Sequence, residues 1–586
     1  MFLGCSLFIS PFYAYSKIDK SQDIQVRIIT TADVHATIYP YDFVEQKPLN
    51  GSLAHVKTLV DKQRADSEKH VILLDNGDLL QGQPTGYYYN QIATGEKHLL
   101  ARVMNYMNYD AATIGNHDIE AGPEVYENMI EKFDFPWLAA NINHIKSGKP
   151  FFEPYTIIEK EGVKIAVIGL ITKKVPDWLP RKLWESLEFA DMYETAKHYM
   201  SHVKENEKPD AIIGLFHSGA GPFLEYQPGR ELPEHASRYI ASYVPGFDII
   251  FSSHDHQQRN ETITNKDGEE VILIAGLPYA RSVAIADLDF SKSTDGSFNL
   301  KSKNGQLLST EPFKPCQDFL STFEKEKKEV LEYVNQPIGY FKKSLFSGDS
   351  FLGNSAFTDF IHRIQMEYTS ADISFVAPLS FDKKIDAGII KISDMYKLYP
   401  FENYLYEMEL TGKEIQNYLE YSYGLWFNTM KSQDDNLLLF RTDDKGNPIP
   451  NKNGNFRLKN RFFNFDSAYG IEYTVDVSKP AGERINIKRL STGEEFRSDK
   501  TYKVALNSYR GSGGGDHLTE GAGIKQSELE RRIVYVSENE IRNLITDYIK
   551  QKEDLTPQKA DNWKIIPENW IPEAAARNKK MLFQEY

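Results

Sequence analysis

The chain has 586 residues, which is too long for a single hydrophobic core and predicts at least two domains. Its 41% hydrophobic and 26% charged residues are typical of an ordinary globular protein without a long low-complexity tract. The formal net charge of −15 gives no general attraction to nucleic-acid backbones and argues against a DNA or RNA polymer as partner. Because Cys5 and Cys316 are the only cysteines, a disulfide framework and a cysteine-based metal site are excluded.

The first fifteen residues are apolar and aromatic, and they are too few to cross a bilayer as a helix. They are typical of the hydrophobic part of a signal peptide, although the usual basic region is missing. We therefore interpret residues 1–23 as a leader and expect a periplasmic or extracellular protein with no transmembrane segment. Leu3, Gly4 and Cys5 also fit a fragment of a lipoprotein signal, but the apolar residues that follow argue against it.

Between residues 24 and 300, short apolar runs alternate with stretches of helical pattern. The runs lie at residues 26–30, 71–74, 111–114, 164–170, 211–216, 248–251 and 271–276. Because buried β-branched strands that alternate with helices are typical of α/β domains, we predict that fold class here.

Three further regions follow the first domain. The charged segment at 310–335 predicts an exposed helix, and we assign residues 301–336 to a linker helix between domains. A second α/β domain is expected at residues 337–552. The tail at 553–586 is rich in Pro, Trp, Asn and Glu, and it either wraps back or frays.

Polar side chains directly follow five of the apolar runs in the first domain. In chain order they are Asp33 and His35, Asp78, Asn116 to Asp118, His217, and His254 and His256. Ligand sites in open α/β sheets gather outside the carboxyl ends of strands, and these residue types bind borderline divalent metals. Each motif alone is weak, since a DxH triplet is usually a solvated turn. Their shared placement predicts a metal centre.

The order of these motifs resembles that of the 5′-nucleotidase family of calcineurin-like metallophosphoesterases, whose signature runs DxH, GD, GNH(D/E), H and HxH. The resemblance covers residues 26–290 and includes the linking text LAANIN and KIAVIGL. It implies a four-layer αββα sandwich for the N-terminal domain. One departure is SHDH at 253–256 in place of the common GHxH, which leaves the ligands unchanged.

The resemblance also implies two divalent metal ions bridged by one carboxylate. The ligands of the first ion would be Asp33, His35, Asp78 and His256. The ligands of the second would be Asp78, Asn116, His217 and His254. Two such cations lower the pKa of a bridging water and clamp the phosphoryl oxygens for in-line attack. Zinc, manganese, cobalt and iron all suit this ligand set.

His117 lies next to a ligand without being one in the family pattern. By resemblance, it stabilises charge in the transition state or protonates the leaving oxygen. A carboxylate should orient this imidazole. Asp118 is the motif residue, but some family members use the carboxylate two positions further on, which here is Glu120. Both remain candidates from the sequence.

Residues from about 339 to 550 resemble the family's C-terminal nucleotide-binding domain, in which two aromatic rings sandwich the base. Aligning FNFDSAYGIEYTVD and NSYRGSGGGD puts Phe465 and Tyr509 at the stacking positions, with Asp516 reaching the ribose hydroxyls. The substrate-binding residues implied in this way are Phe465, Asn507, Tyr509, Arg510 and Asp516.

One departure bears on the substrate. Typical 5′-nucleotidases carry an NxGGxR-type segment, and the corresponding stretch here, SFVAPLSFD at 374–382, has no arginine. It is more similar to the 2′,3′-cyclic-nucleotide 2′-phosphodiesterase/3′-nucleotidase branch. We therefore expect a secreted, monomeric dimetal phosphohydrolase that acts on 2′,3′-cyclic nucleotides and 3′-nucleotides.

Two alternatives remain open from the sequence. The same scaffold also serves 5′-nucleotidases and UDP-sugar hydrolases. An inactive nucleotide-binding protein belongs to a different class, and it is disfavoured because no expected ligand has been lost.

Overall fold

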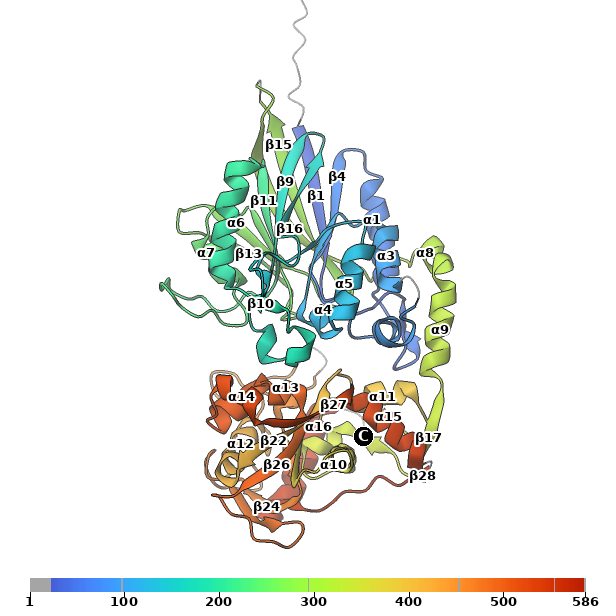
Figure 1. Cartoon of the computed structure of the whole chain (residues 1–586), viewed down its shortest axis with the longest axis vertical. Helices are drawn as coiled ribbons and strands as arrows, with labels where there is room; N and C mark the ends of the chain where they lie inside the picture. Colours follow the sequence, from blue (N-terminus) through green and yellow to red (C-terminus); the bar gives the residue numbers. More distant parts are fainter. Residues whose placement is uncertain (1–22, 96–97, 294, 452–453, 553, 584–586) are drawn as a thin grey trace, which may run out of the picture.

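The structure is a computed structural model that describes residues 23–583, except for 96–97, 294, 452–453 and 553. The expected leader therefore lies outside the described residues, apart from Asp23. Two α/β domains lie one above the other along the long axis (Figure 1). The helices α8 (Gln317–Thr322) and α9 (Glu324–Val334) run along the side of the N-terminal domain towards the C-terminal domain.

The N-terminal domain contains two six-stranded sheets. The first consists, in spatial order, of β16 (Phe298–Ser309), β15 (Ser282–Lys292), β1 (Asp23–Thr31), β4 (Lys69–Asp75), β5 (Ala111–Thr113) and β6 (Trp137–Leu138). The second consists of β13 (Arg259–Thr264), β14 (Glu270–Ala275), β12 (Ile249–Ser252), β11 (Ala211–His217), β9 (Val163–Ile171) and β8 (Tyr155–Lys160). Every predicted apolar run lies in or overlaps one of these strands.

The two sheets pack face to face and helices cover their outer faces, which gives the expected αββα layers. On β1, Val26 and Ile28 point into the cluster between the sheets, whereas Ile29 packs against the outer helices. This alternation follows from the two-residue period of a strand. The covering helices are α1 (Leu53–Arg64), α3 (Leu99–Met107) and α5 (Pro123–Lys132) on the first sheet, and α6 (Met192–Asn206) and α7 (Ser237–Tyr243) on the second.

The linker differs from the sequence interpretation. Residues 301–309 belong to β16, which pairs antiparallel with β15, so the helical part begins only at Gln317. The reason lies in the side chains of β16, since Leu300 and Leu307 pack against the cluster between the sheets. The helix is also divided at Phe323, where α8 ends and α9 follows.

The C-terminal domain is built on a five-stranded mixed sheet. Its strands, in spatial order, are β23 (Ser467–Tyr469), β19 (Ile373–Val376), β26 (Thr501–Asn507), β22 (Tyr404–Thr411) and β27 (Ile533–Glu540). The main helices are α10 (Ala356–Glu367), α11 (Ile392–Leu398), α12 (Gly412–Trp426), α14 (Gln526–Arg532) and α15 (Ile541–Lys552).

The described part of the C-terminal tail wraps back onto this domain. β28 (Asp554–Leu555) joins β17 (Pro337–Phe341) and β21 (Gly388–Lys391), and β29 (Trp563–Ile566) joins β24 (Ile471–Asp476) and β25 (Ile485–Leu490). In α16 (Ile571–Leu582), Ala574 and Leu582 are buried in the main core of the domain. Short two-stranded sheets are formed by β2 (Tyr41–Asp42) with β3 (Lys47–Pro48), β7 (Ile142–His144) with β10 (Leu187–Phe189), and β18 (Leu345–Phe346) with β20 (Lys384–Ile385).

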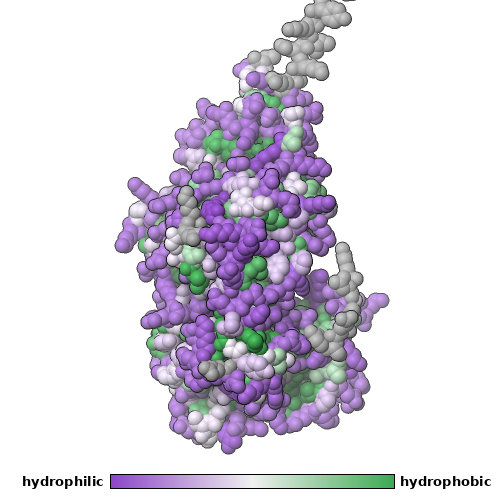
Figure 2. Space-filling view, turned by 90° about the vertical axis from the view of Figure 1, so that its right-hand side faces the viewer, coloured by the Kyte–Doolittle hydropathy of each residue, from purple (hydrophilic) through white to green (hydrophobic). Residues whose placement is uncertain are grey.

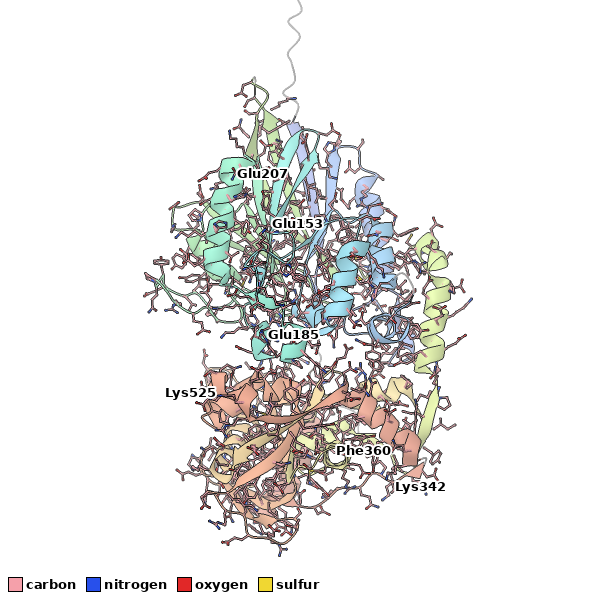
Figure 3. The ribbon with its side chains drawn as sticks, viewed as in Figure 1. Glu153, Glu185, Glu207, Lys342, Phe360 and Lys525 are labelled. Atoms are coloured by element: carbon pink, nitrogen blue, oxygen red, sulfur yellow. The ribbon has the colours of Figure 1, made fainter. Side chains whose placement is uncertain are left out.

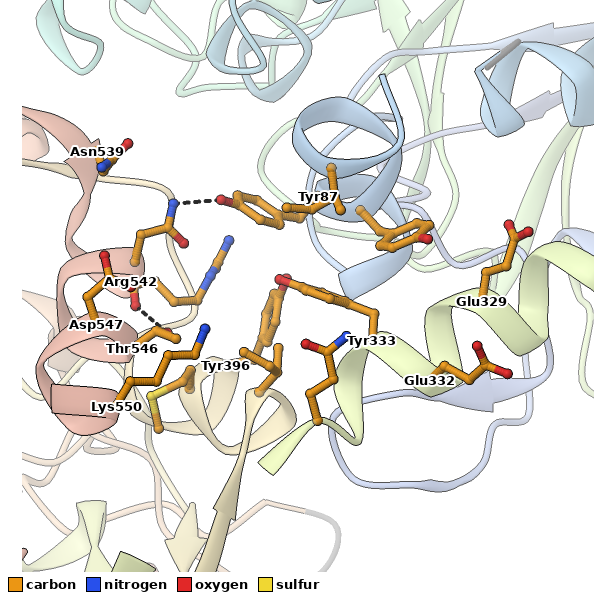
Figure 4. A pocket seen from close by; sticks show the side chains of 16 residues that line it. Tyr87, Glu329, Glu332, Tyr333, Tyr396, Asn539, Arg542, Thr546, Asp547 and Lys550 are labelled. Carbon is orange, nitrogen blue, oxygen red and sulfur yellow. Dashed lines mark hydrogen bonds between the residues drawn. The ribbon is translucent and has the colours of Figure 1, made fainter. Parts of the chain in front are cut away.

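Tyr87, at the end of α2 (Pro84–Tyr87), forms a contact between the two domains beside the linker. Its hydroxyl oxygen accepts a hydrogen bond of 2.7 Å from the Asn543 amide, drawn as a dashed line in Figure 4. The Arg542 guanidinium lies 4.7 Å from the centre of the Tyr87 ring and 4.1 Å from that of the Tyr396 ring. A cavity of about 490 Å³ adjoins this contact. These interactions tie the two domains together near the linker helix.

The outer surface is largely hydrophilic, with only small hydrophobic patches on the face seen in Figure 2. Among the described residues, none of the helices combines the length and apolar character needed to cross a membrane. Charged residues also lie near the domain boundary, with Glu185 on the N-terminal domain and Lys525 on the C-terminal domain (Figure 3).

Candidate functional site

The predicted ligands gather where strands of both N-terminal sheets end. Asp33 and His35 follow β1, and Asp78 follows β4. Asn116 begins α4 (Asn116–Glu120) just after β5, and His217 is the last residue of β11. His254 and His256 follow β12. Because these strands end at a common edge, side chains far apart in the sequence meet there.

The backbone around these side chains is unusual. Five of them have a positive φ, with 49° at Asp33, 50° at His35, 58° at Asp78, 73° at His254 and 57° at His256. A positive φ is uncommon for residues other than glycine, and such conformations cluster at functional sites where surrounding structure holds them. We infer that the backbone after these strands is held in this conformation so that the candidate ligand side chains point towards one another.

Among the described residues, three groups of side chains have potential ligand atoms within 4.8 Å of one another, and two of them consist of predicted ligands; the third is Glu234, His235 and His254. Asp33, His35, Asp78 and His256 form the first group, and Asp78, His217 and His254 form the second. Asp78 is common to the two groups of predicted ligands. The remaining predicted ligand, Asn116, has its Oδ1 atom 3.2 Å from Nε2 of His217. The structure thus brings together all seven residues that the sequence singles out as ligands.

The chemistry of this cluster fits divalent cations. Burial raises the pKa of Asp33 to about 7 and lowers the pKa of His35 to about 4, so the surroundings alone disfavour both charged forms. The Nε2 atoms of His35 and His256 also face each other at 3.0 Å. A bound cation would compensate the buried carboxylates and give both imidazole nitrogens a partner.

Backbone carbonyls and a glutamate orient the histidines of the cluster. His35 Nδ1 lies 2.9 Å from the carbonyl oxygen of Gln81, and His217 Nδ1 lies 2.7 Å from that of Asn76. His254 Nε2 lies 2.8 Å from a carboxylate oxygen of Glu234. Such partners fix ring orientation and tautomer in metal sites. The sequence did not single out these three partners, Gln81, Asn76 and Glu234. Only Asn76 has a position that could have indicated its role, because it directly precedes the Gly-Asp motif.

His117 is paired with Glu120 rather than with Asp118. Its Nδ1 atom lies 2.5 Å from a carboxylate oxygen of Glu120. Burial lowers the pKa of His117, but the charges of Asp78 and Glu120 outweigh it and raise this pKa to about 10. The Asp118 carboxylate instead accepts hydrogen bonds from the backbone N–H groups of Asp78, Leu79, Leu80 and Gly115. Asp118 therefore holds the loop that carries Asp78.

A cleft of about 470 Å³ joins this cluster to the C-terminal domain. Its N-terminal wall includes Asp78, Asn116, His117, Glu120, His254 and His256. Its C-terminal wall includes Leu379, Phe401, Asn403, Arg461, Phe462, Phe463, Asn507 and Tyr509. Two of the predicted substrate-binding residues, Asn507 and Tyr509, therefore line the same cleft as the candidate metal ligands.

The other three predicted substrate-binding residues are placed differently. Phe465 is fully buried and stacks on Trp426, with ring centres 5.4 Å apart, so it belongs to the core. Arg510 is buried and forms two hydrogen bonds, of 2.9 and 3.0 Å, with the Asp466 carboxylate. Asp516 is exposed and is not among the residues that line the cleft.

The burial of Phe465 has a local physical cause. A 3₁₀ turn, η5 (Phe462–Asn464), precedes Phe465, and it places Phe462 and Phe463 on the cleft side while Phe465 enters the core. Gly514 has a packing role beside Tyr509. A Cβ atom on Gly514 would lie 2.5 Å from the Tyr509 ring, so this glycine makes room for that ring.

Together, the αββα fold and the clustered Asp, His and Asn side chains define a metal-dependent phosphoric ester hydrolase. Family models agree: one described as "Calcineurin-like phosphoesterase" matches residues 26–258, and one described as "5′-nucleotidase, C-terminal domain" matches residues 337–522. The chain belongs to the metallophosphoesterase family that combines these two domains.

Curated relatives carry related activities in their names. The trifunctional nucleotide phosphoesterase YfkN of Bacillus subtilis is 27% identical over 93% of this chain, which spans only 39% of that protein. A 2′,3′-cyclic-nucleotide 2′-phosphodiesterase/3′-nucleotidase of Haemophilus influenzae is 25% identical over 93% of this chain and 88% of its own length. A 5′-nucleotidase of Vibrio cholerae is 26% identical over 84% of this chain and 85% of its own.

Solved structures share the fold over nearly the whole chain. A candidate 5′-nucleotidase from Staphylococcus aureus superposes with a TM-score of 0.74, covering 92% of this chain and 99% of that one at 20% identity. A 5′-nucleotidase precursor from Thermus thermophilus gives a TM-score of 0.63, covering 93% and 100% at 20% identity. At this identity the likeness concerns the fold alone.

Proposed function

We propose that this chain removes phosphate from 3′-nucleotides and opens 2′,3′-cyclic nucleotides, using two divalent cations. The observation that carries the proposal is the cleft itself, in which candidate metal ligands and the aromatic residues Phe463 and Tyr509 line one cavity. A nucleotide that spans this cleft would present its phosphate to the cluster and its base to the aromatic rings.

In this proposal the base stacks on Phe463 and Tyr509, in place of the Phe465–Tyr509 pair expected from the sequence. Aromatic rings bind any base through its π-face, which suits an enzyme that tolerates different bases. Gly514 supports the arrangement because it leaves space for the Tyr509 ring. Asn507, from the end of β26, lines the same wall and supplies a polar side chain near the sugar.

The chain's own residues supply orientation and proton handling. Bound divalent cations would generate the attacking nucleophile and neutralise phosphoryl charge. The six clustered Asp and His side chains, together with Asn116 beside His217, would hold these ions, with Asp78 shared. His117, oriented by Glu120, would stabilise developing charge or protonate the leaving ribose oxygen.

The preference for the ribose 2′,3′ edge rests on the segment at 374–382. It contributes the apolar side chain of Leu379 to the cleft wall and contains no arginine, whereas the corresponding segment of typical 5′-nucleotidases carries one. The Haemophilus relative, named for this activity, supports the preference. Export is part of the proposal, and the apolar character of the first fifteen residues supports it.

Hydrolysis of 5′-nucleotides is the second candidate. Arg461 lines the cleft from another segment of the C-terminal domain, so this wall does present a guanidinium group to a bound nucleotide. The Vibrio relative, named 5′-nucleotidase, also favours this reading.

The test is a comparison of initial rates for the manganese-loaded protein on 2′,3′-cyclic AMP, 3′-AMP, 5′-AMP and UDP-glucose. Phosphate release suits the two monoesters, and product chromatography suits the cyclic diester and UDP-glucose. Faster turnover of the first two substrates is expected. Faster turnover of 5′-AMP would reject the preference, and inactivity on all four with metals bound would reject nucleotide hydrolysis.

A further inference from the structure

A second cavity adjoins the substrate cleft. It has a volume of about 380 Å³ and lies in the C-terminal domain. Arg461, Phe462 and Phe463 line both this cavity and the cleft. The two cavities therefore adjoin each other at these three residues.

The charged lining of this second cavity is entirely cationic. It consists of Arg441, Arg457, Lys459 and Arg461, and the described lining residues include neither Asp nor Glu. Among the residues that the structure describes, these four side chains have no ion-pair partner. In a chain with a net charge of −15, four unpaired cations around one cavity run against the average charge of the surface.

The local backbone explains why these cations gather. Arg457, Lys459 and Arg461 lie at every second position of the segment 457–461, and all three line the cavity with exposed side chains, whereas Leu458 is buried. The segment runs beside residues 439–441, with the Arg441 N–H donating to the Arg457 carbonyl oxygen at 2.8 Å. This pairing brings the fourth cation, Arg441, to the same cavity.

We propose that this cavity is a subsite for a second phosphate group of the substrate. The substrate class is a nucleotide that carries one phosphate at the metal cluster and another beyond the aromatic wall, as in a nucleoside 3′,5′-bisphosphate or a dinucleotide. The inference rests on the proposed function. Guanidinium groups bind phosphate oxygens through paired N–H donors, and a lysine adds a point charge.

The test compares KM values of the metal-loaded protein for 3′-AMP, for adenosine 3′,5′-bisphosphate and for an adenosine dinucleotide with a terminal 3′-phosphate. We expect a KM about fivefold lower for at least one two-phosphate substrate, a modest gain because exposed charges are screened by water and salt. Raising the salt concentration should shrink this difference more than it changes the KM for 3′-AMP.

The double variant Arg457→Gln/Lys459→Gln should raise the KM for the two-phosphate substrate to that of 3′-AMP. Its kinetics on 3′-AMP should be unchanged, since neither residue lines the substrate cleft. Arg461 is left intact because it lines both cavities. The matched control is Lys413→Gln/Lys488→Gln, which removes the same charge from exposed positions of the same domain.

Each outcome has a definite meaning. Equal KM values in a wild-type protein that hydrolyses 3′-AMP would overturn the subsite alone. A preference that survives in the Arg457→Gln/Lys459→Gln variant, or is lost equally in the control variant, would also overturn it. Absence of any nucleotide hydrolysis would overturn the proposed function and the subsite together.

Discussion

Nδ1 of His117 lies 2.5 Å from a carboxylate oxygen of Glu120, while the adjacent Asp118 turns to the backbone of the loop that carries Asp78. The two neighbouring carboxylates therefore have separate roles. Glu120 orients an imidazole that faces the cleft, and Asp118 fixes the position of a candidate metal ligand. This division allows catalytic and structural effects to be separated by substitution.

Replacing His117 with Asn should reduce kcat by about 10²- to 10⁴-fold, the usual contribution of a general acid or charge-stabilising group. Metal content should stay at the wild-type level, because His117 belongs to neither group of candidate ligands. Phosphate release from 3′-AMP measures the first effect and elemental analysis the second. A variant with near-normal kcat would remove His117 from the proposed chemistry.

Glu120→Gln and Asp118→Asn should differ in kind. The first should lower kcat by about 10- to 100-fold, as loss of an orienting partner does, with an unchanged melting temperature. The second should lower the stability of the N-terminal domain by about 1–3 kcal/mol, because an amide cannot accept hydrogen bonds from all four backbone donors. Thermal unfolding beside steady-state kinetics distinguishes them, and equal melting temperatures would refute the assignment.

Phe463→Ala and Phe465→Leu form a second contrasting pair. Loss of the Phe463 ring from the cleft should raise KM by about 5- to 100-fold, which corresponds to the binding free energy that stacking of one base contributes. Phe465→Leu should leave KM unchanged and lower stability by about 1 kcal/mol, because Phe465 packs against Trp426 in the core. If Phe465→Leu instead raised KM in a stable protein, the sequence alignment would have located the stacking residue correctly.

Phe463 and Phe465 also show which part of the site the sequence alone could predict. Asp33 and His217 can be predicted because each lies at the end of an apolar run, and strands of both N-terminal sheets end at a common edge. Phe463 cannot, since the choice among the aromatic residues of FFNF depends on the 3₁₀ turn at 462–464. The polar composition of residues 301–309 favours a linker and hides the strand alternation by which Leu307 packs against the cluster between the sheets.

Removal of divalent metal should abolish hydrolysis, and the shared ligand should matter most. Asp78→Asn should weaken both bound ions, since Asp78 belongs to both ligand groups, whereas His256→Asn should weaken only one. Elemental analysis after dialysis, followed by titration with manganese, would measure this difference. Loss of a single ion in Asp78→Asn would contradict the bridging role.

His362 should make the C-terminal domain sensitive to acid. Its ring is fully buried, with Nδ1 2.9 Å from the Ser374 hydroxyl and Nε2 3.2 Å from the Ser467 hydroxyl, and burial lowers its pKa to about 3. The unfolded chain has a histidine pKa of about 6.5, so protonation favours the unfolded state. The neutral ring's contribution is complete above pH 6.5 and falls as the pH drops towards 3. At pH 5 the loss should be about 2 kcal/mol.

Urea unfolding followed by tryptophan fluorescence at pH 7 and pH 5 measures this loss. His362→Gln should unfold with a smaller difference between the two pH values than the wild type, even if it is less stable at pH 7. His198→Gln, at an exposed position of α6, is the matched control and should keep the wild-type difference. An unchanged pH difference in His362→Gln would show that other groups govern the acid sensitivity of this domain.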